Sequence, residues 1–287
     1  MQFRLIVYII KGRMDIDGGI PQSTNYKGLP IMKRMLLLLL ITICMLSGCR
    51  KAEQAESRKE LLIYCGITMI MPMQEIAKIV EQEKNCTIKI TKQGSGALLN
   101  SIKANRVGDL FLPGAESYIK TCIDEGLVKE TVFVGYNRAA LIVQKGNPLH
   151  ITPDVRNLTN KQYRVVLGSA ESGSIGRETE RILGPLGIYQ EALDNALFLT
   201  SDSKGMVKAI LDKNADLVLN WYASSVWEEN RPFMDGLLLD DKVAPPHKLV
   251  LGLLTFSPYP DIARRFMELA SSEQGQKIFA RHGFLEK

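Results

Sequence analysis

Residues 87–113 read TIKITKQGSGALLNSIKANRVGDLFLP, and this stretch decides the fold. Thr87 to Thr91 has the composition of a strand, and Gly94-Ser95-Gly96 forms a loop after it. Ala97 to Asn105 carries apolar residues at helical spacing, and Asp109 to Pro113 is a second apolar strand. Strand, loop, helix and strand in this order predict a βαβ unit, in which the two strands run parallel and the helix covers one face.

The same alternation continues along the rest of the chain. It predicts an α/β fold with open, mostly parallel sheets that are flanked by helices on both faces. The predicted strands are 61–65, 87–91, 109–113, 139–143, 164–167, 217–220 and 249–256. The predicted helices are 73–83, 97–105, 116–125, a segment ending at 183, 206–211, 222–229, 262–269 and 273–280.

An export signal precedes this region. Met32-Lys33-Arg34 is followed by the uncharged apolar run 35–45, and the sequence Leu46-Ser47-Gly48-Cys49 resembles the bacterial lipobox. The run is shorter than the roughly 20 residues that a membrane-spanning helix needs. The pattern predicts a lipoprotein signal peptide at 32–48, acylation of Cys49, and a charged tether over 49–60. We interpret residues 1–31 as a spurious upstream extension, with Met32 as the true start; a genuine cytoplasmic extension is the alternative.

Removal of the signal changes the charge of the chain. The 287 residues contain 36 Lys and Arg against 31 Asp and Glu, a formal charge of +5. Six of the basic and two of the acidic residues precede Cys49, which leaves 30 against 29 in residues 49–287. A net charge of +1 gives no basis for a nucleic-acid partner.

Three cysteines remain after the lipid-bearing one, an odd number for an exported protein. Cys65 ends one predicted strand and Cys86 begins the next parallel one, so the two lie at opposite ends of a sheet, which opposes a disulfide between them. A pairing of Cys86 with Cys122 stays open. None of the three has the spacing of a metal site.

Four loops that follow predicted strands carry hydroxyl side chains. In open α/β sheets, ligands bind at the carboxyl ends of strands, where helix N-termini offer free N–H groups. Such hydroxyl and amide donors suit a dehydrated anion, although a serine or threonine that only caps its helix would look the same. The loops are Gly66-Ile67-Thr68, Gly94-Ser95-Gly96, 168–176 with its three serines, and Trp221-Tyr222-Ala223-Ser224.

The chain resembles the molybdate-type solute-binding proteins of ABC importers, which have the type II periplasmic-binding fold. The resemblance rests on LLIYCGITM, KQGSGALLNSIKANRVGDLFLPGAE, VQKGNP, GSAESGSIGRETERIL, NADLVLNWYASS and SSEQGQKIFARHGF. It implies two α/β lobes joined by two crossover strands, with an oxyanion in the cleft between them and a permease as partner. Lobe 1 would comprise 61–140 and 247–287, and lobe 2 would comprise 141–246.

The resemblance also assigns ligand-binding residues. The family's first two serines correspond to Thr68 and Ser95, and its tyrosine corresponds to Tyr222. Its Pro-Ala-Gly turn corresponds to Ser174-Ile175-Gly176, and its Asn-Val-Arg segment to Asp202-Ser203-Lys204. The predicted ligand-binding residues are Thr68, Ser95, Ser174, Ile175, Ser203 and Tyr222.

The charge of the ligand decides which side chains it needs. Molybdate, tungstate and sulfate are fully ionised and need donors only, whereas hydrogen phosphate also presents a proton that requires an acceptor. Glu171 and Asp202 are the acceptors that the candidate loops offer, although each is also expected as a solvated loop residue or a helix cap. Molybdate or tungstate is therefore the expected ligand, and sulfate, phosphate or another small solute is the alternative.

An enzyme is the main rival from a different class of protein. The sequence lacks a Gly-x-Ser-x-Gly motif and a Walker loop, and its three histidines are isolated along the chain. Cys65 is the only plausible nucleophile, although a cysteine in an apolar strand is commonly a small core residue. We therefore expect a non-enzymatic, monomeric, exported protein without a cofactor, anchored by lipid to the cell membrane. A ligand-sensing domain of a transcription regulator is opposed by the export signal.

Overall fold

The computed structural model describes residues 58–284. The predictions for the upstream extension 1–31, the signal peptide 32–48, the lipidated Cys49 and most of the tether concern residues outside this part. Within residues 58–284, every helix is too short or too polar to cross a membrane.

The first of two five-stranded sheets has the order β2-β1-β3-β10-β4. β1 pairs in parallel with β2 and β3, whereas β10 is antiparallel to both β3 and β4. Every residue of β1 after Glu60 is buried, apart from Leu62, which is half-buried, as a covered parallel strand requires. The strands are β1 (Glu60–Gly66), β2 (Thr87–Gln93), β3 (Leu110–Leu112), β4 (Val128–Asn137) and β10 (His247–Leu254).

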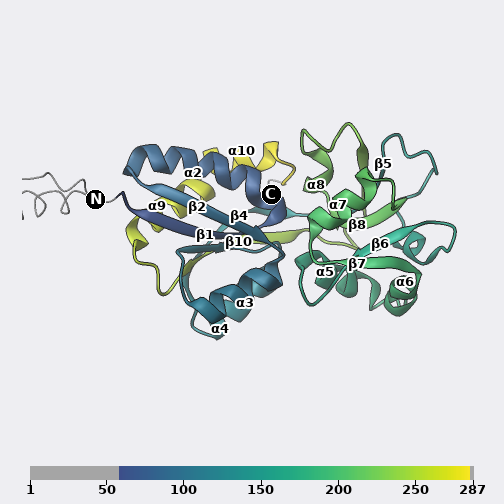
Figure 1. Cartoon of the computed structure of the whole chain (residues 1–287), viewed down its shortest axis with the longest axis horizontal. Helices are drawn as coiled ribbons and strands as arrows, with labels where there is room; N and C mark the ends of the chain where they lie inside the picture. The colour runs from purple at the N-terminus through teal and green to yellow at the C-terminus, as the bar shows by residue number, and fades with distance from the viewer. Residues whose placement is uncertain (1–57, 285–287) are drawn as a thin grey trace, which may run out of the picture. The chain divides into compact units, whose positions relative to one another are not determined.

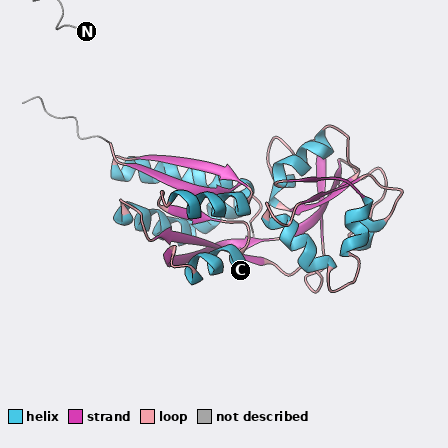
Figure 2. Ribbon diagram, turned by 60° about the horizontal axis from the view of Figure 1, so that its bottom comes forward, coloured by secondary structure: helices cyan, strands magenta, loops and turns pink. Residues whose placement is uncertain are grey.

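Helices cover both faces of this sheet, and we call the whole unit lobe 1 (Figures 1 and 2). One apolar core joins the sheet to α2, α9 and α10, and a second joins its other face to α3 and α4. A short 3-10 helix, η1 (Ile67–Met69), leads from β1 into α2. The helices are α2 (Ile70–Lys84), α3 (Ser95–Asn105), α4 (Glu116–Asp124), α9 (Pro260–Ser271) and α10 (Glu273–Arg281).

The second sheet, in lobe 2, has the order β7-β6-β8-β5-β9 and is built around a single apolar core. β6 pairs in parallel with β7 and β8, and β5 is antiparallel to β8 and β9. The strands are β5 (Ala139–Gln144), β6 (Val165–Gly168), β7 (Ala196–Thr200), β8 (Leu217–Trp221) and β9 (Met234–Leu238). The helices are α5 (Ser174–Leu183), α6 (Tyr189–Asn195), α7 (Ser203–Leu211), the short α8 (Ala223–Val226) and the 3-10 helix η2 (Val155–Thr159).

The chain passes between the sheets twice, from β4 to β5 and from β9 to β10 (Figure 1). The α/β fold with two lobes and two crossovers is confirmed, but each sheet has two parallel and two antiparallel pairings rather than being mostly parallel. The reason is that β10 returns from lobe 2 and enters the first sheet between β3 and β4 in the opposite direction. In the second sheet, β5 holds the corresponding position.

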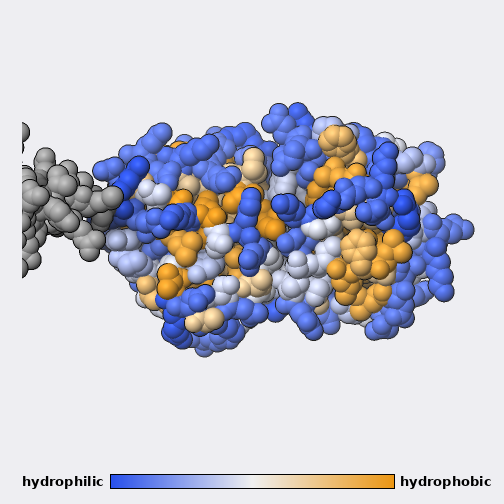
Figure 3. Space-filling view, viewed as in Figure 1, coloured by the Kyte–Doolittle hydropathy of each residue, from blue (hydrophilic) through white to orange (hydrophobic). Residues whose placement is uncertain are grey.

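Three strands and one helix escaped prediction: β4, β7, β9 and α6. β7 lies at the edge of its sheet, and its three central apolar residues are exposed: Leu197, Phe198 and Leu199. They contribute to an apolar patch of the lobe 2 surface (Figure 3). An edge strand that is apolar on both faces lacks the alternation that identifies a half-buried strand.

The three cysteines of the described chain are all buried and free. The pairing of Cys86 with Cys122 that the sequence left open is therefore not present. Asp109, directly before β3, has a structural role. Its carboxylate accepts hydrogen bonds from Leu62 N at 2.8 Å and from the Ser257 hydroxyl at 2.5 Å.

Candidate interlobe ligand site

A small cleft lies where the two lobes meet. Its free volume is about 10 Å³, roughly the room that one water molecule needs. Lobe 1 and lobe 2 both contribute to the walls, so an occupant would contact both. The lining residues are Gly66, Ile67, Thr68, Gln93, Gly94, Ser95, Gly114, Gly173, Ser174, Ile175, Asp202, Ser203 and Trp221.

Helix N-termini point at this cleft from both lobes. Ser95 is the first residue of α3, Ser174 of α5 and Ser203 of α7, and Thr68 lies in η1 just before α2. The first N–H groups of a helix have no partner within the helix, and they carry the positive end of its dipole. The cleft therefore presents backbone donors and hydroxyls, which is the set that holds an anion.

Ser95 and Ser174 are the best-defined donors of the site. Both are buried. The Ser95 hydroxyl oxygen accepts a hydrogen bond from the backbone N–H of Gly114 at 3.0 Å. The Ser174 hydroxyl oxygen accepts one from the indole N–H of Trp221 at 3.1 Å. Each serine therefore keeps its own proton for a further acceptor.

Glycines in lobe 1 let the lobes approach this closely. A Cβ at Gly114 would lie 2.3 Å from the Ser174 hydroxyl oxygen, and a Cβ at Gly96 would lie 2.6 Å from the carbonyl oxygen of Glu171. The backbone N–H of Gly96 donates to the carbonyl of Ser172 at 3.1 Å, a direct hydrogen bond between the lobes. Side chains at these positions would hold the lobes apart.

The other predicted residues have different surroundings. Thr68 is buried, and its hydroxyl donates to the sulfur of Met69 at 3.1 Å. Ile175 lines the cleft and also belongs to the lobe 2 core, where its side chain packs against Gly168. The backbone of Ser203 accepts a hydrogen bond from Asn220.

Tyr222 is separated from the other five predicted residues. It does not line the cleft, and its ring lies against Gly236 of β9 and the core of lobe 2. Trp221 occupies the cleft instead, one residue earlier. The end of β8 explains the difference, because Trp221 is the last residue of the strand, whereas Tyr222 has a helical backbone conformation and already begins the turn into α8.

The sequence placed Trp221 in a candidate loop but did not predict it as a ligand-binding residue, and it gave no prediction for Gly114. The signal for Trp221 was its place as the last residue of an apolar strand, where ligands bind in this kind of sheet. The signal for Gly114 was equally local, because it directly follows the strand that ends in Leu112-Pro113.

The charges around the cleft are unusual for an anion site. The lining contains no Lys, Arg or His, and Asp202 is its one ionisable residue. Asp202 caps α7, since its carboxylate accepts from Gly205 N at 3.0 Å. Glu171, the other acceptor suggested by the sequence, is exposed and lies outside the lining. An anion held in this cleft would therefore have to rely on neutral donors.

Two contacts from α5 tie the lobes together beside the cleft. The guanidinium of Arg177 lies 4.1 Å from the ring centroid of Tyr118 on α4. Glu178, buried in lobe 2, approaches the His247 ring nitrogen of β10 at 2.6 Å and the Arg181 guanidinium at 2.6 Å. Burial alone would raise the pKa of Glu178, but the hydrogen bonds from Arg181 and His247 outweigh it and hold this pKa below its ordinary value.

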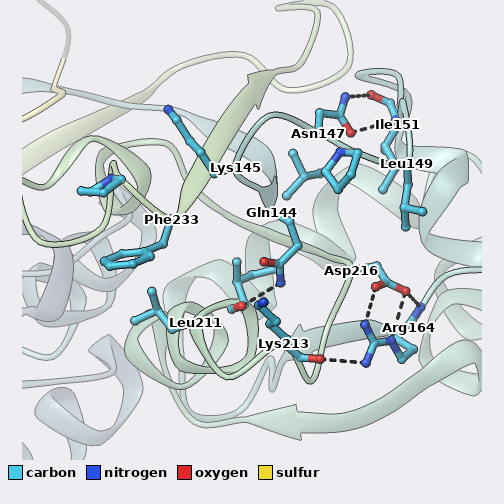
Figure 4. A pocket seen from close by; sticks show the side chains of 14 residues that line it. Gln144, Lys145, Asn147, Leu149, Ile151, Arg164, Leu211, Lys213, Asp216 and Phe233 are labelled. Carbon is cyan, nitrogen blue, oxygen red and sulfur yellow. Dashed lines mark hydrogen bonds and ion pairs between the residues drawn. The ribbon is translucent and has the colours of Figure 1, made fainter.

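A much larger cavity, about 500 Å³, lies elsewhere in lobe 2 (Figure 4). Its walls are largely apolar, with Leu149, Leu211 and Phe233 among them. Two of its polar side chains already have partners, since Arg164 is paired with Asp216 and the Gln144 amide donates to two backbone carbonyls. A small anion needs converging uncommitted donors, so volume does not identify the anion site here.

Cys65 is unsuited to nucleophilic chemistry. It is fully buried, and its thiol donates to the carbonyl of Gly66 at 3.3 Å. Burial raises the pKa of this thiol far above its ordinary value, so the reactive thiolate is not formed at neutral pH. In the described part of the chain, no group of His, Cys, Asp or Glu could hold a metal ion.

A two-lobed fold with donors converging on an interlobe cleft defines a solute-binding protein. Residues 61–285 match the family model of bacterial extracellular solute-binding proteins, and the chain belongs to this family. Members of the family bind solutes for ABC transporters and are not enzymes.

Individual relatives agree with this assignment. YvgL of Bacillus subtilis strain 168, provisionally named an ABC transporter substrate-binding lipoprotein, is 23% identical over 257 residues, which cover 87% of this chain and 96% of YvgL. The periplasmic molybdate-binding protein of Azotobacter vinelandii superposes with a TM-score of 0.66 at 13% identity, covering 79% of this chain and 99% of that one. The sulfate-binding protein SubI of Mycobacterium tuberculosis H37Rv gives a TM-score of 0.68 at 13% identity, covering 79% and 86%.

Proposed function

We propose that the protein captures a tetrahedral oxyanion, molybdate or tungstate, in the interlobe cleft and delivers it to an ABC permease. The observation that carries the proposal is the convergence of hydroxyls and helix N-termini from both lobes on one buried point without a cationic side chain. Fixed neutral donors suit a fully ionised anion, because each oxygen needs donors only. The molybdate-binding structural neighbour supports the same ligand class.

Ligand binding would be coupled to hinge closure. The free volume of about 10 Å³ is too small for a four-oxygen anion, so entry requires the lobes to part. An anion that bridges Ser95 and Ser174 favours the closed form by its additional contacts there. Exclusion of water would then strengthen each donor contact.

Hydrogen phosphate is the second candidate, and one residue favours it. The Asp202 carboxylate lies in the cleft wall and could accept the proton of that anion. The two candidates differ in this requirement for an acceptor, whereas sulfate shares the donor-only requirement and would be separated from molybdate by size.

Calorimetric titration of the purified protein with molybdate, tungstate, sulfate and phosphate tests these assignments. We expect the tightest binding for molybdate or tungstate. Tightest binding of phosphate, weakened by Asp202→Asn, would favour the second candidate, and binding of none of the four anions would overturn the proposal.

We further propose that the protein acts as a monomer that is held at the outer face of the cell membrane by lipid on Cys49. Labelling of cells with a radioactive fatty acid tests the anchor. We expect the wild-type protein to be labelled and the Cys49→Ser variant to lose the label; an unlabelled wild-type protein would contradict the anchor.

A further inference from the structure

The two serines of the cleft are oriented by different means. Gly114 directs its backbone N–H at Ser95, and Trp221 directs its indole N–H at Ser174. A serine hydroxyl has one proton and two lone pairs, and an indole N–H can only donate. In each serine, one acceptor position is therefore occupied by a group that cannot reverse its role.

Trp221 is held firmly enough to act in this way. Only 1% of it is exposed, and its backbone N–H donates to the side-chain oxygen of Asn220 at 2.8 Å. Its ring lies edge-on to that of His247, with 6.0 Å between the centroids. Because it ends β8, it is also fixed by pairing with Ala139 of β5.

We propose that Trp221 is a specificity-determining positioning residue, which keeps Ser174 a donor and so favours anions without a proton. A protonated ligand would need an acceptor, and the indole N–H leaves only one of the two lone pairs of the Ser174 oxygen for that purpose. This inference rests on the proposed oxyanion function and deepens it. It also replaces Tyr222, whose ring lies against Gly236, as the aromatic residue of the site.

Trp221→Phe tests the proposal, because phenylalanine keeps an aromatic ring but has no N–H group. Full-length wild-type and variant proteins would be titrated calorimetrically with molybdate and with phosphate at neutral pH. The expected result is about tenfold weaker molybdate binding, the effect of one hydrogen bond, with phosphate binding unchanged or improved. The preference for molybdate over phosphate therefore falls about tenfold or more.

Two further variants make the outcome decisive. In a Ser174→Ala background, Trp221→Phe should have little additional effect, because its partner is already absent. Trp227→Phe is the matched control, since this tryptophan does not line the cleft, and it should leave both affinities unchanged. The Trp227→Phe protein should also retain a change in fluorescence on adding molybdate, now arising from Trp221.

Equal weakening of both anions by Trp221→Phe, or an unchanged preference, would overturn the inference, because a merely structural residue gives that result. Additive losses in the double variant would do the same. If wild-type protein binds neither anion, the proposed function fails first and the inference falls with it, and that result is distinguishable from failure of the inference alone.

Discussion

The two lobes have the same sheet plan but build their halves of the site differently. Each sheet has two parallel pairings on one side of its central strand, β3 or β8, and two antiparallel pairings on the other side. Lobe 1 orients Ser95 with a backbone N–H, whereas lobe 2 orients Ser174 with a side chain. The lobe 1 half of the site therefore depends on backbone geometry and on glycine, and the lobe 2 half depends on the identity of one aromatic residue.

Gly114→Ala is the most severe test of whether the lobe 1 side of the cleft depends on glycine. The added methyl would lie 2.3 Å from the Ser174 oxygen and 3.3 Å from the Trp221 indole nitrogen, so the lobes could not close. Overpacking of this kind costs about 1–3 kcal/mol, and loss of a bridged ligand adds to it, so we expect anion affinity to fall on the order of 100-fold. Calorimetry measures the affinity. Thermal unfolding should be little changed, and unaltered affinity would show that the lobes need not approach so closely.

The next largest loss of anion affinity is expected when a single cleft hydroxyl is removed, from lobe 1 in one variant and from lobe 2 in another. Ser95→Ala and Ser174→Ala should each weaken anion binding by about 1–3 kcal/mol, the cost of one missing donor. Similar losses would show that the lobes contribute equally despite their different means of orientation. Ser101→Ala is the control, because the Ser101 hydroxyl donates within α3 to the Ala97 carbonyl at 3.0 Å. Unchanged titrations for both cleft variants would contradict the site assignment.

The contact between Arg177 and Tyr118 joins the lobes outside the cleft. A cation over an aromatic ring at an exposed site contributes about 0.5–1 kcal/mol, so Arg177→Ala should weaken binding about two- to fivefold and speed ligand release. Stopped-flow measurement of release detects this, and Arg156→Ala, on an arginine paired within lobe 2 to Asp154, is the control. Identical release rates in the two variants would show that this contact does not hold the lobes.

Acid should weaken the contact between Glu178 and His247. The pKa of Glu178 is held below its ordinary value of 4.5 in the folded state. A group with a lowered folded pKa stabilises the fold above its unfolded pKa, and this stability is lost as the pH falls through the folded pKa. We expect a decline in the melting temperature below about pH 4.5 that is shallower in Glu178→Gln.

Glu83→Gln provides the matched control for this acid effect. Glu83 also has a lowered pKa, because it is hydrogen-bonded to Arg265, but its pair is solvent-exposed and should contribute less. Equal slopes of melting temperature against pH for wild type and Glu178→Gln would exclude Glu178 as the group responsible.

Lobe 1 was largely predictable from sequence because residues close together in the chain determine where most of its helices and strands begin and end. The stretch 87–113 forms strand, helix and strand within one or two residues of the predicted ends at most positions, since apolar spacing and glycines mark them. Ser95 and Thr68 lie in the loops that follow their strands. Because such loops lie at the carboxyl edge of the sheet, the sequence position of each residue also predicted its place in the cleft.

Lobe 2 was less predictable because its decisive features depend on packing between distant segments. The choice between Trp221 and Tyr222 depends on where β8 ends, because Trp221 closes the strand and Tyr222 begins the turn into α8. The position of β8 is set by its pairing with β5 and β6. The side chain of Ile175 turns into the core because Gly168 leaves room for it. The contacts of Arg177 and Glu178 with lobe 1 could not be predicted, because they depend on how the two crossovers place lobe 1 beside α5.

Helix α5 connects the cleft with the contacts that its next turn makes to lobe 1. It carries Ser174 at its first residue and Arg177 and Glu178 in the next turn, and three residues of helix rise only about 4.5 Å. A rigid segment of this length cannot tilt at one point without moving at the other. Any force that loosens Arg177 from Tyr118 would therefore also displace Ser174, so opening of the lobes and release of an anion held by Ser174 would occur together.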